Sequence, residues 1–386
     1  MAHRDGDEVL RLEGRRLLQP ALRLIQRLRP VGTERDRAKN RKLFFDQYIS
    51  LLLLYFFTPT LTSLRGLQHA SNWEQTKRKL GLSRASLGSL SEAAGVFDAK
   101  YLRAVVQELA CQALPLTKGR EAEALRGLTA VDGTFFAALP QMAWALWRNN
   151  SPERGVKLHL HFDVLKGVPC DATLTPAACS EQAQLKATLQ PERLYVLDRG
   201  YAGYELFAAI RKARSSLIAR VKDNTAFEVQ QERPLDDEAR QAGIVRDVII
   251  SRLGTSHHKN HFPGQLLRLV VVKTQDRDGP KELWLLTDRL DLSAALVALA
   301  YRHRWSVELF FRWLKCVLGA RHLVSYQENG VALQMYAAMI VSLLIVIHTG
   351  RKPTKRTFET IQFYLAGWVS DEEFDAHLAS LKKIQS

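Results

Sequence analysis

The chain has 386 residues, of which 46% are hydrophobic and 25% are charged, as in an ordinary globular protein. Lys and Arg outnumber Asp and Glu by 55 to 40. The net charge of +15 indicates a phosphate-rich partner, because basic surface gains affinity for nucleic acid by releasing counterions. The four cysteines lie far apart and predict reduced thiols rather than a disulfide framework. Because we find neither a signal peptide nor an apolar run of about 20 residues, we expect no membrane association.

Residues 1–125 are predicted to form a helical N-terminal region that binds DNA. Residues 1–42 form a basic stretch, mostly helical in pattern, that is either a solvated surface or a set of phosphate contacts. An apolar helix is expected over residues 43–66, ended or kinked by Pro59. Leu80-Gly81-Leu82-Ser83 predicts a helix stop, a tight turn and an N-cap, a pattern found in helix-turn-helix readers of DNA and in many other helical hairpins.

The pattern changes from helical to strand-like near residue 126, and residues 126–222 are predicted to be the first part of a catalytic core. Three strands, a helix, a strand, a helix and a last strand predict an α/β fold with a mixed sheet flanked by helices. The strands are expected over residues 128–136, 155–164, 173–175, 193–198 and 216–222, and the helices over 185–189 and 204–213.

A β-rich insertion is predicted over residues 223–289, after which residues 290–350 complete the core and 351–386 form a helical tail. The insertion contains His257, His258 and His261, which either belong to a plain loop or bind a metal ion. Its strands are expected over residues 244–253, 266–273 and 282–287.

An uninterrupted helix is predicted over residues 301–315, with Asp291 or Ser293 as candidate caps. At about 100° per residue, five polar side chains fall on one face, namely Tyr301, Arg304, Glu308, Arg312 and Lys315. A second face carries the apolar residues Ala300, Val307, Phe310, Phe311, Leu314, Val317 and Leu318, and should pack on a core. The polar face is either a solvated surface with an Arg304–Glu308 ion pair, or a site for a polyanion and a metal ion.

Two aspartates are expected where strands end beside a glycine, which is where α/β sheets place ligands. Asp132 precedes Gly133, and Asp198 precedes Arg199 and Gly200. If both strands are central, the two carboxylates converge at one edge, and Glu308 can join them. Three carboxylates would favour Mg²⁺ or Mn²⁺, and two such ions suit a phosphoryl displacement in which Asp132 bridges them. The alternative is that each aspartate only forms a turn, and Asp163 is a competing acid.

Asp132-Gly-Thr, Asp198-Arg-Gly-Tyr and Tyr301-x2-Arg304-x3-Glu308-x6-Lys315 resemble motifs of the DDE transposases of the insertion sequence 4 family. The resemblance covers roughly residues 70–350. It implies an RNase H-like core interrupted by the insertion, and Mg²⁺-dependent cleavage of transposon ends followed by strand transfer. It also implies that Asp132, Asp198 and Glu308 are the catalytic, metal-binding triad. Tyr301, Arg304 and Lys315 would contact DNA, and Trp284 would either stack on a flipped base or fill the insertion's core.

Four further residues, Arg199, Arg220, Lys222 and Arg312, are candidate DNA contacts beside the presumed site. The expected partners are double-stranded DNA, as terminal inverted repeats and as target, and a second copy of the chain in the DNA complex. The resemblance places the protein in a bacterial cytoplasm, associated with the nucleoid. Two alternatives remain: another RNase H-like nuclease such as a junction resolvase, or a DNA-binding protein without catalytic activity.

Overall fold

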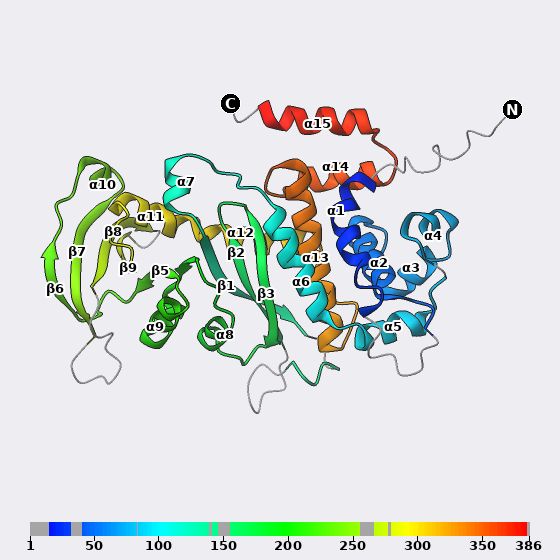
Figure 1. The fold of residues 1–386 in the computed structure, drawn as a ribbon, viewed down its shortest axis with the longest axis horizontal. Coiled ribbons are helices and arrows are strands. Elements are labelled where there is room, and N and C mark those ends of the chain that lie inside the picture. The colour runs from blue at the N-terminus through cyan, green and yellow to red at the C-terminus, as the bar shows by residue number, and fades with distance from the viewer. Residues whose placement is uncertain are drawn as a thin grey trace.

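The computed structural model describes residues 15–31, 41–82, 84–138, 141–145, 155–254, 266–276 and 279–383. These residues form a mixed α/β structure, with one large sheet at one end of the long axis and a bundle of helices at the other (Figure 1). The prediction of a mixed sheet flanked by helices is therefore confirmed.

Within the described residues, nine strands form a single sheet in the order β3-β2-β1-β4-β5-β9-β8-β7-β6. β1 pairs in parallel with β4 and β4 in parallel with β5, whereas all other neighbours are antiparallel. The strands are β1 (Leu128–Ala137), β2 (Gly155–Asp163), β3 (Val168–Pro176), β4 (Leu194–Leu197), β5 (Ser216–Val221), β6 (Phe227–Glu232), β7 (Ile244–Leu253), β8 (Leu267–Asp276) and β9 (Gly279–Thr287).

Helices cover both faces of the sheet, because alternate residues of the central strands are apolar on each side. On one face, α8 (Glu181–Ala187) and α9 (Tyr204–Lys212) share a core with the strands through Leu185 and Phe207. On the other face, α11 (Ala294–His303) and α12 (Trp305–Arg312) bury Val297 and Val307 in a second core. α8 and α9 lie next to each other beside β1 and β5 (Figure 1).

The second core continues without interruption into the helical end of the molecule. α13 (Glu328–Thr349) contacts both α2 (Phe45–Phe57) and α6 (Ala99–Gln112), and α6 packs on β3. The remaining helices are α1 (Arg15–Gln26), α3 (Leu64–Ala70), α4 (Glu74–Leu80), α5 (Leu87–Val96), α7 (Arg120–Ala124), α14 (Lys355–Leu365) and α15 (Asp371–Lys383).

The predicted turn at Gly81 is confirmed, but the helix after it starts later than predicted. Gly81 ends α4 with a left-handed φ of 62°, a conformation that glycine adopts without strain. The N-cap of α5 is Ser86, whose hydroxyl accepts a hydrogen bond from the Ser89 amide at 3.0 Å. The predicted N-cap Ser83 lies outside the described residues, as do residues 1–14 and 32–40 of the basic stretch. Pro59 follows the end of α2, as expected.

The insertion is an extension of the sheet, since β9 pairs with β5 and β8, β7 and β6 follow outward. β6 was not predicted, because its polar sequence is exposed at the edge and lacks an apolar alternation. A short helix, α10 (Asp237–Gln241), lies between β6 and β7.

A buried charge cluster ties the insertion to the segment that leads into α11. Arg268 of β8 donates two hydrogen bonds of 2.7 Å to Asp247 of β7, and the two side chains are only 1% and 3% exposed. Arg268 also donates to the carbonyl of Leu292, and Arg233 donates to the carbonyl of Leu290 at 3.0 Å. These contacts hold the backbone immediately before Ser293, the N-cap of α11.

α13 is the longest helix in the part of the chain that the structure describes. Its 22 residues have a mean hydropathy of 2.3 over an 18-residue window and could cross a membrane by length and composition alone. In the structure, 89% of that window is buried inside the protein, as expected for a core helix.

The predicted helix over residues 301–315 is not continuous. α11 ends at His303, and the Arg304 amide bonds to the Tyr301 carbonyl at 3.0 Å in a tighter turn before α12 begins. After α12, residues Trp313–Val317 widen into a π-helical turn. Ser293 caps α11 as predicted, and the predicted apolar face is buried except for the half-buried Val317.

Candidate active site

The register of β1 and β4 places Asp132 and Asp198 at the same level of the sheet. Ala130 of β1 pairs with Val196 of β4, and both are buried in the core beneath α11 and α12. Asp132 lies two residues after Ala130, and Asp198 lies two residues after Val196. Because side chains alternate along a strand, both aspartates continue the face of the sheet that α11 and α12 cover. Asp132 was predicted to end its strand, but β1 runs on to Ala137 because β2 continues to pair with it.

Short backbone hydrogen bonds orient both carboxylates. Asp132 Oδ1 accepts the amide of Gly133 at 2.8 Å, and Asp198 Oδ1 accepts the amide of Gly200 at 2.8 Å. Asp198 is the N-cap of the 3₁₀ turn Arg199–Tyr201, which explains why β4 stops directly before it.

α12 adds Glu308 and a cation to this edge. Arg304 Nη2 donates to Glu308 Oε1 at 2.6 Å, and Arg304 Nη1 lies 3.9 Å from Asp132 Oδ2. The side chains of Asp132, Arg304 and Glu308 are 21%, 15% and 28% exposed, so the group is accessible from solvent but largely desolvated. Arg304 therefore bridges two of the three predicted triad residues.

The charges at this edge are not balanced. Burial, together with the charges of Asp198 and Glu308, raises the pKa of Asp132 to about 6 despite the lowering effects of the Gly133 amide and Arg304. Asp198 and Glu308 are thus both near enough to act on the pKa of Asp132, although burial is the largest cause of its shift. One guanidinium is not enough to offset them.

The residue types suit a hard divalent cation, because all three side chains are carboxylates and Mg²⁺ and Mn²⁺ prefer oxygen. Among the residues that the structure describes, no three His, Cys, Asp or Glu side chains are grouped closely enough to hold an ion. Arg304 instead supplies the positive charge between Asp132 and Glu308. An ion at this edge would compete with Arg304 for these carboxylates. The predicted histidine site at His257, His258 and His261 lies outside the described residues.

The competing acid Asp163 has a structural role at the end of β2. It accepts the Lys166 amide at 3.1 Å and lies 3.4 Å from Arg193.

The predicted DNA contacts on α11, β5 and the π-helical turn lie on the same side of the sheet as the carboxylates. Tyr301 is half-buried, and its ring centroid is 6.0 Å from the guanidinium carbon of Arg304. Burial raises the pKa of Tyr301, while Arg304 and Arg220 lower it, so Arg220 is also close. Lys315 Nζ lies 5.0 Å from the ring of Phe136, further along β1.

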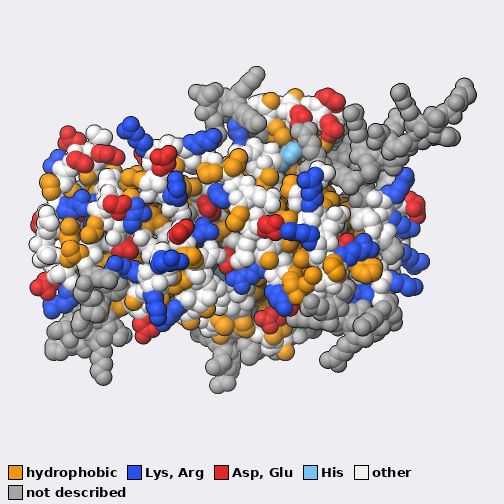
Figure 2. All heavy atoms as spheres, viewed as in Figure 1, with side chains coloured by type: hydrophobic (Ala, Val, Ile, Leu, Met, Phe, Trp, Pro, Cys, Tyr) orange, Lys and Arg blue, Asp and Glu red, His pale blue; other side chains and the backbone are white. Residues whose placement is uncertain are grey.

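Arg199, Lys222 and Arg312 are exposed around this edge. Lys and Arg side chains on the face drawn in Figure 2 are spread over both the sheet and the helical end.

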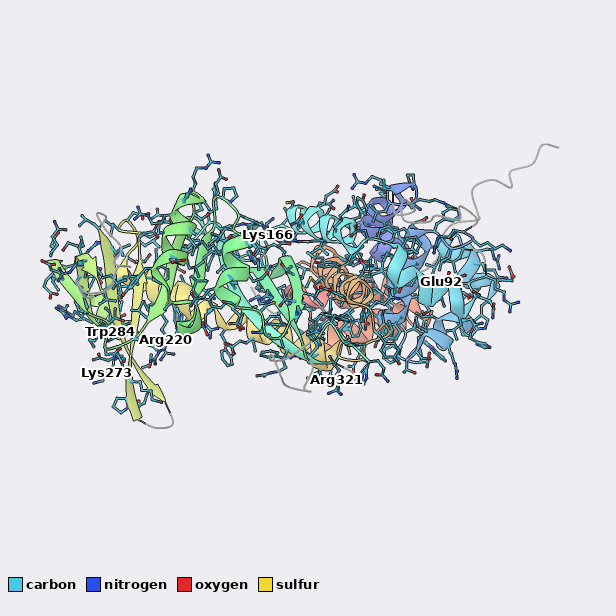
Figure 3. The ribbon with its side chains drawn as sticks, turned by 90° about the horizontal axis from the view of Figure 1, so that it is seen from below. Glu92, Lys166, Arg220, Lys273, Trp284 and Arg321 are labelled. Atoms are coloured by element: carbon cyan, nitrogen blue, oxygen red, sulfur yellow. The ribbon has the colours of Figure 1, made fainter. Side chains whose placement is uncertain are left out.

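Trp284 lies on the other face of the sheet from the carboxylates. It pairs with Val221, packs against the core beneath α8 and α9, and contacts Phe227 edge-on at 5.6 Å. Figure 3 shows Trp284 and Arg220 near each other where β9 meets β5, and strand alternation sends their side chains to opposite faces. This placement matches the alternative in which Trp284 fills a core of the protein, and not the one in which it stacks on a flipped base.

A cavity of about 370 Å³ adjoins the carboxylate edge between α11 and the insertion. Tyr301, Arg304 and Trp305 line it on one side, and Lys273 and Thr274 of β8 line it on the other. The exposed Trp305 was not singled out as a site residue by the sequence analysis, although it follows Arg304 directly.

Three further residues near the aspartates were also missed. Tyr201 is 1% exposed, and its hydroxyl has no hydrogen-bond partner among the described residues. Lys157 of β2 and Glu181 of α8 form an ion pair of 3.2 Å beside Gly133. The predicted helix covers residues 185–189, whereas α8 begins at Glu181, so Glu181 lies outside the predicted helix.

Known proteins resemble this chain over the region that contains the carboxylates. A family profile described as the Transposase DDE domain matches residues 123–344. A Sinorhizobium fredii protein, y4zB, provisionally named as a transposase, is 30% identical over 59% of this chain and 62% of its own length. A Geobacillus stearothermophilus protein, also provisionally named, as the transposase for insertion sequence element IS5377, is 27% identical over 53% of this chain and 52% of its own length.

The chain therefore spans about three fifths of the first relative and about half of the second. Among solved structures, a piggyBac transposase synaptic complex with hairpin DNA is 11% identical, with a TM-score of 0.43, over 92% of this chain and 80% of that chain. That likeness is too low to assign the fold.

Proposed function

Because the chain belongs to the Transposase DDE domain family, we propose that it is a DNA transposase that cleaves the ends of an insertion sequence and transfers the strands to target DNA. The resemblance first seen in the motifs around Asp132, Asp198 and Glu308 is confirmed at the level of this family. The activity, the DNA substrates and the metal ions are parts of the proposal.

One observation carries the proposal. Asp132, Asp198 and Glu308, which are far apart in the sequence, share one face at the point where β1 and β4 separate. Acidic residues that only serve the fold are normally paired with cations, whereas here three carboxylates surround the single guanidinium of Arg304, and burial raises the pKa of Asp132 despite that guanidinium. A site of this kind suits divalent cations and the phosphates of DNA.

We further propose that Asp132, Asp198 and Glu308 hold two Mg²⁺ or Mn²⁺ ions. When bound, such ions activate the attacking hydroxyl or water and stabilise the leaving oxygen in phosphoryl transfer. The chain's own side chains prepare the site: the amides of Gly133 and Gly200 orient the aspartates, and α12 brings Glu308 to them. Asp132 is proposed to bridge the two ions, and it lies on β1 between Asp198 of the neighbouring strand end and the Arg304–Glu308 pair of α12.

Arg304 is proposed to exchange partners when DNA and ions bind. Its guanidinium contacts Glu308 and Asp132, and it also lines the neighbouring cavity with Tyr301. Cations that occupy the carboxylates would free the guanidinium to bind a phosphate, for which its planar fork is suited. Tyr301, Lys315, Arg312, Arg199, Arg220 and Lys222 are the further proposed DNA contacts, and Trp284 is the least favourably placed.

The strand arrangement supports an RNase H-like core. β3, β2 and β1 form an antiparallel meander, followed in the sheet by the parallel strands β4 and β5. On this basis residues 126–222 and 290–350 are the core, 223–289 the insertion, 1–125 the N-terminal DNA-binding region and 351–386 the tail. The proposed partners are terminal inverted repeats, target DNA and a second copy of the chain, in the nucleoid of a bacterial cytoplasm.

The test uses the purified chain, Mg²⁺ and linear DNA that carries the inverted repeats flanking this gene. We expect nicks at the repeat ends, and we expect Glu308→Gln to lower the cleavage rate at least a thousandfold while DNA binding persists. The matched control is Glu359→Gln, which removes the carboxylate of another i, i+4 pair, Lys355–Glu359 on α14.

Cleavage by Glu308→Gln at the normal rate would refute the assignment. Preferential cutting of branched DNA would instead indicate a junction resolvase. DNA binding without any Mg²⁺-dependent reaction would indicate a non-catalytic DNA-binding protein.

A further inference from the structure

The first turn of α8 contacts the backbone beside both aspartates. α8 begins after its N-cap Ser180 and lies on the face of the sheet opposite α12 (Figure 1). Its first two residues, Glu181 and Gln182, contact different segments of the backbone. Glu181 reaches β1 next to Asp132, and Gln182 reaches the turn next to Asp198.

Glu181 and Lys157 close over the backbone of Gly133. Glu181 Oε1 lies 3.2 Å from Lys157 Nζ, and the Lys157 side chain is 10% exposed. A Cβ atom on Gly133 would lie 2.8 Å from Glu181 Oε1 and 3.4 Å from Lys157 Cδ. Gly133 is also the residue whose amide holds the carboxylate of Asp132. The ion pair thus packs directly on the peptide that orients this aspartate.

Gln182 makes the corresponding contact with the backbone beside the other aspartate, Asp198. Its Nε2 donates to the carbonyl of Gly200 at 2.9 Å, and the amide of Gly200 donates to Asp198. A Cβ atom on Gly203 would lie 2.7 Å from Gln182 Oε1. Two neighbouring residues of one helix therefore contact the two glycines that hold the two carboxylates.

Tyr201 gives an independent sign that this region is built for more than packing. Its buried hydroxyl has no hydrogen-bond partner among the described residues, which is costly for a polar group. Burial raises the pKa of Tyr201, and the charges of Glu181, Asp132 and Asp198 raise it further, so the phenol lies among these acids.

We propose that Glu181 and Gln182 are positioning residues that set the spacing between Asp132 and Asp198 and thereby the affinity of the site for divalent cations. Because strand alternation sends Asp132 toward α12 and Gly133 toward α8, Glu181 acts through the backbone and is not itself a ligand. This inference rests on the proposed function, since it takes the two aspartates as the metal ligands. Residues that orient metal ligands typically change metal affinity about 10–100-fold when they are replaced.

The test measures Mn²⁺ binding to the full chain by electron paramagnetic resonance, which reports free Mn²⁺ without any need for cleavage activity. We expect Glu181→Gln and Lys157→Met each to weaken binding about tenfold or more. Lys157→Arg should retain most of the affinity because it keeps the ion pair. The control is Glu205→Gln, which removes a pair of the same kind, Lys186–Glu205 at 3.3 Å, between α8 and α9.

A second comparison distinguishes a local effect of Glu181 on Gly133 from a general loss of folding. Gly133→Ala should weaken Mn²⁺ binding by displacing the Glu181 carboxylate, but it should have no further effect in a Glu181→Ala chain, where the space is free. Independent, additive effects of the two changes would overturn the inference, as would normal Mn²⁺ binding by Glu181→Gln.

The metal-free thermal unfolding midpoint of each variant is measured in parallel. If Mn²⁺ affinity falls only in variants whose unfolding midpoint also falls, the loss reflects unfolding, and this result would also overturn the positioning role. If the unsubstituted chain binds no Mn²⁺, the proposed function itself is contradicted. This result differs from the outcomes above, which all compare variants with a parent chain that does bind Mn²⁺.

Discussion

Two charged clusters in this molecule have the same chemical components but opposite character. In the insertion, Asp247 and Arg268 are joined by two hydrogen bonds of 2.7 Å and are almost fully buried. At the carboxylate edge, Arg304 pairs with Glu308 at 2.6 Å but stays 3.9 Å from Asp132, and a third acid, Asp198, lies close by. In the first cluster one carboxylate lies between two guanidiniums, because Arg233 Nε is also 3.7 Å from Asp247 Oδ2, whereas the second cluster has three carboxylates beside one guanidinium.

This difference separates a structural role from a functional one. A buried pair with complete hydrogen bonding holds two strands and the start of α11 in place, and it has no capacity left for a ligand. At the carboxylate edge the acids are partly exposed and burial raises the pKa of Asp132, so the negative charge of this residue is unfavourable and a bound cation would relieve it. The following predictions test this contrast.

The largest effect is expected for Asp132→Asn. The strand-cleavage rate should fall at least a thousandfold, because a neutral amide cannot replace the carboxylate at the centre of the site. In the absence of divalent cations, the free energy of unfolding should rise by roughly 1–3 kcal/mol, since the amide removes a charge that burial and the neighbouring acids disfavour. Cleavage assays and urea denaturation measure the two effects. A clear loss of stability would contradict the contrast.

The buried cluster should behave in the opposite way. Asp247→Asn is expected to lower the free energy of unfolding by about 3–5 kcal/mol, because it leaves Arg268 buried with an uncompensated charge. The double variant Asp247→Leu/Arg268→Met should recover most of that loss. Urea denaturation at pH 7 measures the free energy of unfolding of the single and double variants. As a control, replacing the exposed pair Arg246–Glu232 should change stability by less than about 1 kcal/mol.

A smaller effect is expected from a buried group without a charge partner. Burial lowers the pKa of His161 to about 4, so the folded protein keeps this histidine neutral while the unfolded chain binds a proton below its ordinary pKa near 6.5. Stability should therefore fall as the pH drops from 6.5 toward 4. His161→Gln should remove about 2–3 kcal/mol of that loss, measured by denaturation at several pH values. An unchanged pH profile would show that His161 is accessible to protons.

The smallest effect is expected for Arg312→Ala. Arg312 is exposed on α12, four residues after Glu308, so its proposed phosphate contact is peripheral. Its removal should weaken DNA binding a few-fold and reduce the slope of log affinity against log salt by about 1. Arg356→Ala on α14, which is also exposed, is the control. Equal effects from both variants would mean that net charge, and not the position of Arg312, determines the change.

Much of the secondary structure was predictable because hydrophobic periodicity is a local property. The expected strand at 244–253 coincides with β7, and the expected strand at 155–164 and helix at 204–213 match β2 and α9 to within one residue. The errors occur where the pattern is polar or the backbone departs from regular geometry. They include the edge strand β6, the early start of α8 and the break at Arg304.

The amino-acid sequence by itself determined that Arg304, Glu308 and Arg312 share a face, because their four-residue spacing follows from helical geometry, but it did not show the break at Arg304 or the π-helical turn that carries Lys315. It also placed each aspartate beside a glycine near the end of an apolar segment. Only the tertiary structure decided that Ala130 pairs with Val196, that Arg304 lies between Asp132 and Glu308, and that α8 contacts both glycine-containing turns. These relations join elements far apart in the chain, and they depend on strand register and packing, which no local periodicity encodes.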